Sequence, residues 1–182
     1  MSDKISPTSV SKTALPFGLL FGILLILETV IFYVADIDPI MNPTVGTVMN
    51  IANYLILPPL LIYIACNSFK KLNSGFISFG ECLKSGVIVC IIAALLFALF
   101  SVAFNVIFPE YMDEILSKTK SVMIANSPEM TSEQVEMALS VTKKFMSPMI
   151  LIPATIAIYA FIGLIHSLII GAIVKKDKFQ SL

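Results

Sequence analysis

The sequence has little charge and no arginine. Only 13% of its 182 residues are charged and 57% are hydrophobic, whereas a soluble domain has about 25% and about 45–50%. This composition excludes a disordered chain and an ordinary cytosolic enzyme. All twelve cations are Lys. Without Arg there is no bidentate phosphate clamp, and without a basic excess there is no face for nucleic acid.

The sequence also lacks the common catalytic and metal-binding motifs. It has one His and three Cys, which excludes the two-histidine zinc motif. It shows neither a nucleophile elbow, nor a phosphate-binding loop, nor a dinucleotide fingerprint. We therefore predict no catalytic, metal or cofactor residues and a protein that is not an enzyme.

What the sequence does have is four long apolar runs, at residues 14–35, 45–66, 83–108 and 149–174. About 20 apolar residues suffice for a helix to cross ~30 Å of hydrocarbon. The sequence predicts an all-α membrane protein, with four transmembrane helices in a single domain, 14–174. We interpret the first run as a retained helix, because it is too long for a signal peptide and has Tyr33 where cleavage needs a small residue.

Charge placement predicts the orientation, because Lys accumulates on the cytoplasmic side. The N-terminus 1–13 (with Lys4), the second connection 67–81 and the tail 175–182, together with Lys84 at the start of the third run, hold eight Lys against three acids. The other two connections, 36–44 and 109–148, hold four Lys against eight acids. We therefore expect a multi-pass protein with both termini cytoplasmic. The basic side serves as a topology anchor or also contacts anionic lipid.

The connection 109–148 contains two amphipathic patterns, so we expect an external pair of helices between spans three and four. Thr131 and Gln134 form a capping-box pattern at the start of the second. The pair either packs on itself over the bundle or binds a partner. The two expected apolar stripes are Tyr111, Ile115, Leu116, Thr119, Val122 and Met123 in the first helix, and Val135, Ala138, Leu139, Thr142, Phe145 and Met146 in the second.

The one acidic residue inside a run is Glu28. A charged side chain costs ~3 kcal/mol in the bilayer centre on insertion scales and suggests a function. Glu28 lies about seven residues, ~10 Å, from the end of its run, and Asn53 lies at nearly the same depth on the next. We expect a Glu28–Asn53 pair, with Asn50 one turn further out. It serves either as an interhelical contact or as a proton or cation relay.

His166 is the remaining ionisable candidate, in the fourth run. Pro58 and Pro59 free carbonyls near Tyr54 and Leu55, at a level where His166 would find an acceptor. We interpret His166 as a helix-contact residue, with a proton carrier as the alternative.

Two further patterns have a structural and a functional interpretation. Asp36 and Asp38 in the first connection indicate an ordinary turn of a tight hairpin, or a weak cation site. Small residues recur every four positions on three runs, as in Gly18 and Gly22. This spacing indicates close helix contacts, within the bundle or in a homodimer.

Two segments resemble a known family. They are Lys70-Lys71-Leu72-Asn73-Ser74-Gly75-Phe76-Ile77-Ser78-Phe79-Gly80-Glu81-Cys82-Leu83-Lys84-Ser85-Gly86 and the later Met130-Thr131-Ser132-Glu133-Gln134-Val135-Glu136 with Thr142-Lys143-Lys144-Phe145-Met146-Ser147-Pro148. Nearly the whole chain is similar to small four-span membrane proteins of Bacteroidota, a family of unknown function. The resemblance implies a bacterial inner-membrane location and the four-span layout, and it brings no catalytic residues.

These observations give one leading hypothesis and one alternative. The first is a non-enzymatic interaction or accessory module of the inner membrane, whose partners are the lipid bilayer and another protein or a second copy. Neither the substrate nor the activity follows from the residues. The alternative is a small proton- or cation-coupled transporter component that uses Glu28.

Overall fold

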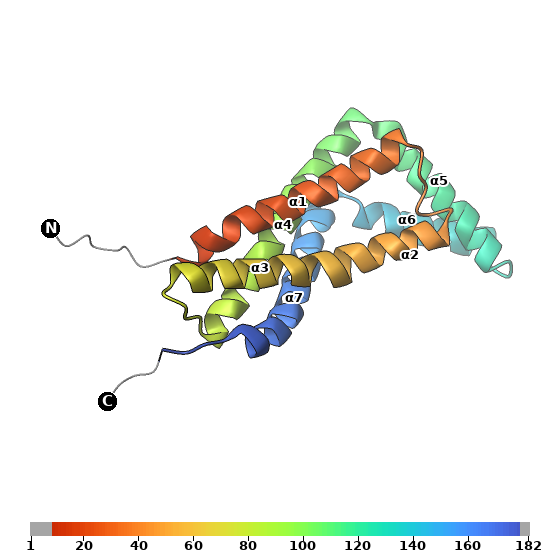
Figure 1. Ribbon diagram of the computed structural model, residues 1–182. Coiled ribbons are helices and arrows are strands. Elements are labelled where there is room, and N and C mark those ends of the chain that lie inside the picture. Colours follow the sequence, from red (N-terminus) through yellow and green to blue (C-terminus); the bar gives the residue numbers. More distant parts are fainter. Residues whose placement is uncertain (1–8, 179–182) are drawn as a thin grey trace.

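The computed structural model describes residues 9–178 and is helical throughout its length (Figure 1). Lys4 and the rest of 1–8, and 179–182 of the expected tail, lie outside the described residues. The elements are α1 Val10–Val34, α2 Pro43–Ile51, the π-helical turn η1 Ala52–Ile56, α3 Leu57–Leu72, α4 Phe79–Ile107, α5 Pro109–Asn126, α6 Ser132–Phe145 and α7 Pro148–Val174.

Within residues 9–178, four helices are long and apolar enough to cross a membrane: α1, the continuous segment α2–η1–α3, α4 and α7. The all-α class is confirmed. The second helix differs from expectation, because it continues past residue 66 to Leu72. Lys70 and Lys71 lie in its last turn, where cations suit the helix dipole. The connection to α4 is therefore only 73–78, and Ser78 caps α4 in a capping box with Glu81.

The α3–α4 turn and the end of α7 are joined at one end of the bundle. Ile77 and Lys176 exchange two backbone hydrogen bonds, of 3.0 and 2.8 Å. Lys70 Nζ donates to the carbonyl of Val174 at 2.8 Å. The first turn of α1 lies at this same end, whereas α5 and α6 lie at the other end (Figure 1). We call these the terminal end and the loop end.

Helix α4 is central, because both α1 and α7 pack along it. Its contact with α7 is close enough to need glycine on both sides. A Cβ added at Gly163 would lie 2.8 Å from the Gly86 carbonyl oxygen, and one at Gly86 would lie 2.5 Å from the Ser167 Cβ. On α1, a Cβ added at Gly18 would likewise lie 2.7 Å from the Cβ of Ile92 in α4. These small residues are therefore used for contacts inside one chain.

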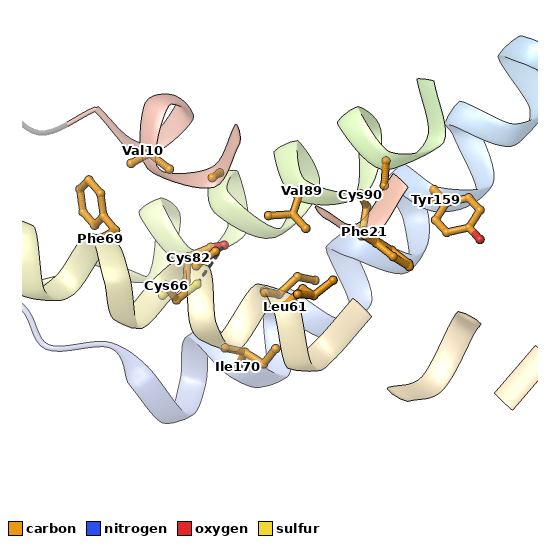
Figure 2. Packing of buried hydrophobic residues seen from close by; sticks show 14 of the residues in the cluster. Val10, Phe21, Leu61, Cys66, Phe69, Cys82, Val89, Cys90, Tyr159 and Ile170 are labelled. Atoms are coloured by element: carbon orange, nitrogen blue, oxygen red, sulfur yellow. Dashed lines mark hydrogen bonds between the residues drawn. The ribbon is translucent and has the colours of Figure 1, made fainter. Parts of the chain in front are cut away.

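The buried core lies in the terminal half, where α1, α3, α4 and α7 meet (Figure 2). It contains large apolar side chains such as Phe21, Ile62 and Phe69, each at most 1% exposed. The three cysteines, Cys66, Cys82 and Cys90, are buried there as free thiols. This half of the molecule is closed and apolar.

The loop half is open, and here the expectation of a tight hairpin is wrong. The turn between α1 and α2 is short, but no residue of Pro43–Ile51 is buried. The turn makes the separation possible, since Asp36 adopts a left-handed φ of 52°. Pro39 then sits on Gly46, whose missing side chain leaves room for the Pro39 carbonyl. Helix α2 thus diverges from α1 and leaves a groove between them.

The α4–α7 contact gives a matched pair of substitutions. We expect Gly163→Ala to lower the free energy of unfolding by about 1–3 kcal/mol, because the new methyl group overlaps backbone. Gly80→Ala, in open space on α4, should instead raise it slightly, since alanine favours the helix. Unfolding of both variants in mixed detergent–SDS micelles measures this. Equal effects would contradict the close approach.

Candidate functional site

The centre of the candidate site is the pair that the sequence predicted. Asn53 Nδ2 donates to Glu28 Oε2 at 2.5 Å. Asn53 is only 6% exposed, and Glu28 is half-buried. The contact joins α1 to the second helix at the depth where α2 begins to diverge. It therefore lies at the boundary between the closed and open halves.

A π-helical turn places Asn53 in this position. The Leu57 N–H bonds to the Ala52 carbonyl five residues back, instead of four. Pro58 and Pro59 explain the wider turn, since each lacks an N–H and its ring crowds the carbonyl of the preceding turn. Asn50, expected one turn further out, is exposed on α2 and is not part of the contact with Glu28.

Two tyrosines lie beside the pair. The Tyr159 ring of α7 is 5.8 Å from that of Tyr54 and 5.7 Å from that of Phe21. Figure 2 shows Tyr159 and Phe21 together at the edge of the buried cluster. Tyr159 is 5% exposed. Sequence reasoning missed it, because a tyrosine within an apolar run gives no signal of its partners.

His166 does not join this site. Its Nδ1 lies 2.9 Å from the carbonyl oxygen of Ile162, one turn back in its own helix. The expected acceptors near Tyr54 and Leu55 are therefore not used, and this part of the prediction is wrong. The carbonyl of its own helix therefore serves as the partner of this nitrogen, and the contact involves no other span.

A groove opens from Glu28 toward the loop end. It has a volume of about 340 Å³ and is lined by α1, the α1–α2 turn and α2. Apart from Glu28 and Thr44, its walls are apolar, with Phe32, Val48 and Met49 among them. Because Val48 is 62% exposed, one side of the groove faces the surroundings.

Above this groove lies a small cavity of about 120 Å³ with charged and apolar walls, between the α1–α2 turn and α5. Lys118 of α5 bridges Asp38 of the turn at 2.6 Å and Glu114 at 2.5 Å. Asp38 also accepts from the Ile40 and Met41 N–H groups. Partial burial opposes the charge of Asp38, but these bonds prevail and hold its pKa below the ordinary value. Its oxygens stabilise the turn, which favours the turn over a cation site.

An aromatic cluster holds α5 in this position. The Tyr33 ring of α1 lies 5.1 Å from Phe104 of α4 and 5.6 Å from Tyr111 of α5. Phe104 and Tyr111 are 5.2 Å apart in an edge arrangement, which suits aromatic quadrupoles. Burial raises the pKa of the Tyr111 hydroxyl, and this residue also lines the cavity.

Helix α6 has a feature that the sequence reasoning missed. Of its expected apolar face, Val135 is buried and the rest is half-buried, except Phe145. A second apolar stripe is exposed: Met137, Val141 and Phe145 are 64%, 46% and 59% exposed. These residues are four apart. The regular spacing was readable, but it ran beside the stronger stripe that was assigned to the core.

Comparison with known proteins places the chain in a family. A family model described as "Protein of unknown function (DUF4199)" matches residues 16–176. Neither the curated proteins nor the solved structures gave a match. The family match agrees with the resemblance to a family of unknown function seen in the sequence.

The Glu28–Asn53 contact predicts non-additive substitutions. Asn53→Leu should lower the free energy of unfolding by about 1–2 kcal/mol, because the Glu28 carboxyl loses its donor. Glu28→Gln should change it by less than about 0.5 kcal/mol, since the new amide oxygen still accepts.

The double variant Glu28→Met/Asn53→Leu should recover most of the loss, because no polar group then remains unpaired. Unfolding in detergent–SDS micelles measures all three variants. Purely additive effects would show that the two side chains are energetically independent.

Proposed function

The chain belongs to the DUF4199 family, and we propose that it is an accessory protein of the bacterial inner membrane that works by binding rather than by catalysis. Its four apolar helices support a multi-pass membrane protein. The proposed binding partner is another membrane protein, and the proposed binding surface is the second stripe of α6, formed by Met137, Val141 and Phe145.

Charge distribution supports an orientation with both termini in the cytoplasm. The terminal end carries Lys70, Lys71, Lys175 and Lys176 beside the joined α3–α4 turn. The loop end carries the acids of the α1–α2 turn and the first turns of α5 and α6. In this orientation α5 and α6 face the periplasm.

The exposed stripe of α6 is the observation that carries the proposal. A helix outside the membrane spans would normally turn its apolar side to the protein, and α6 already does so with Val135. A second stripe costs solvation unless something covers it. Beside the stripe lies a shallow groove, lined partly by Met130 and Met137, and methionine suits adaptable contact surfaces.

The charges of α6 favour a protein over the lipid surface. Helices that lie on a bilayer usually have a polar face rich in Lys or Arg. In α6, Glu133 and Glu136 balance Lys143 and Lys144, and Glu129 precedes them. This helix therefore has no basic excess to attract anionic headgroups. Apolar side chains of a protein partner can cover the stripe, and this contact needs no basic excess on α6.

The alternative, a proton- or cation-coupled transporter, has one supporting observation, the Glu28–Asn53 contact at the base of the groove. The terminal half offers it little support. Between Glu28 and that end lie Leu25, Leu61 and Phe69, each at most 4% exposed. Transport would need a second conformation that opens this apolar layer. Binding needs only the surface already present.

The orientation predicts which cysteines react from outside. In a variant without the three native cysteines, Lys120→Cys should react with a membrane-impermeant maleimide in spheroplasts. Lys71→Cys should react only after permeabilisation. Both positions are exposed, so accessibility in the fold is matched. Labelling in the reverse order would overturn the proposed topology.

The proposed surface predicts a site-specific crosslink. A photoreactive amino acid at Met137 should yield one discrete protein adduct in native membranes, whereas one at Ser121, exposed on α5, should not. Val141→Glu should remove the adduct, because it places a charge in the apolar contact.

The identified partner, purified, must bind the wild type and not the Val141→Glu variant. Exposed Ser140, on the neighbouring side of α6, provides the control substitution Ser140→Glu, which should retain binding. Lipid adducts alone would contradict a protein partner. An adduct of twice the chain's own mass would indicate a second copy instead.

A further inference from the structure

The cavity below the α1–α2 turn and the apolar groove adjoin each other. Phe32, Ile37 and Met49 line both. The cavity is the mouth, at the loop end, and the groove descends from it along α2 to Glu28. A cavity of about 120 Å³ that charged side chains line in part thus lies next to an apolar groove of about 340 Å³. An amphiphile has this division of polarity.

The size of the groove matches one lipid chain in one leaflet. Its walls run from Thr44 to Ala52, nine residues of helix, whose eight steps rise ~12 Å. One leaflet contributes about 15 Å of hydrocarbon, half of ~30 Å. The groove therefore ends near the middle of the bilayer, at the Glu28–Asn53 contact. Its open side, at Val48, lets a chain enter from the surrounding lipid.

The charges of the mouth favour a cationic group. Asp36, Asp38 and Glu114 line it, against one cation, Lys118. Lys118 already bridges Asp38 and Glu114, which leaves an excess of negative charge beside Asp36. The volume holds about four water molecules at ~30 Å³ each, so an aminoethyl group fits and a bulky sugar does not.

We propose that this site binds a membrane phospholipid whose headgroup carries a primary amine. The ammonium group donates to the carboxylates of Asp36 and Glu114. The phosphate stays outside the cavity, within reach of the partly exposed Lys118. One acyl chain fills the groove along α2. This site is separate from the α6 surface, so either proposal stands or fails without the other.

A free amine would not account for the whole site. The cavity offers a free amine charge, but the adjoining groove would then be left to an acyl chain of another molecule in the surrounding lipid. A lipid without the amine would fill the groove, but it would leave the excess carboxylate unanswered. A single molecule with both an ammonium group and an acyl chain occupies both the cavity and the groove. This is why a phospholipid with an ammonium headgroup is the occupant that fits.

Native mass spectrometry of the purified full chain tests the proposal. The protein is released from detergent with equal amounts of phosphatidylethanolamine and phosphatidylcholine of identical acyl chains. The two share the phosphate and the positive charge, but only the first has N–H donors. We expect about tenfold preference for phosphatidylethanolamine, the ratio that one charge-assisted hydrogen bond provides.

Two variants separate the parts of the site. Asp36→Asn keeps a residue that tolerates the left-handed backbone at this turn, and it should reduce the preference to below about twofold. Its control is Asp113→Asn, an exposed acid of α5 that does not line the cavity. Val48→Trp should fill the groove and lower retention of either lipid. Its control is Val106→Trp on α4, which is 76% exposed.

Three results would overturn the proposal. Equal retention of the two lipids would remove the role of the amine. Unchanged retention in Val48→Trp would remove the role of the groove. Phosphoethanolamine that displaces the lipid at equal concentration would show that the mouth alone binds. Loss of preference in Asp36→Asn, together with loss of retention in Val48→Trp, supports the joined site.

Discussion

The close approach of α4 and α7 is the contact on which the rest of the arrangement depends. In a bilayer, apolar surface gains little by contacting other apolar surface, so helices associate through close packing of small residues. Gly86 and Gly163 allow the two backbones to meet. With α7 fixed along one side of α4, α1 packs along the other, and α3 completes the terminal half. Helix α2 then has no remaining surface to join.

The proline pair converts this packing into an open site. A regular α-helix across 43–72 would continue in one direction. Its constant number of residues per turn would then decide whether Asn53 faces the bundle or the surroundings. The wide turn at Ala52–Ile56 changes that period at the level of Glu28. The Asn53 amide then meets the carboxyl, while the residues before it leave the bundle. The polar contact and the apolar groove therefore have the same origin.

The class of fold and the central polar pair were predictable from the sequence, for physical reasons that are local. Span length follows from run length, and two residues at equal depth on consecutive helices are natural neighbours. The capping boxes at Ser78 and Thr131 are formed as local chemistry expects. The acceptor of His166 was not predictable from depth, because its own helix competes at every level.

What remained hidden depends on angles between helices. The turn at 36–42 is compatible with either a closed or a splayed hairpin, and the choice rests on Pro39 against Gly46 and on the φ of Asp36. Neither is visible as a pattern. The second stripe of α6 could likewise be recognised as exposed only once the structure showed that the first stripe packs against the protein. Periodicity identifies apolar faces but does not rank which of them is covered.

The link between α4 and α5 has a mechanical consequence. Phe108 alone separates these helices, and its ring lies 5.2 Å from Tyr33 and 4.9 Å from Phe104. Lys118 ties the same helix to the turn before α2. A force applied to α5 is thus delivered to α1, α4 and α2 together, with no slack segment between. A displacement of α5 would therefore move residues that line the cavity beside the groove.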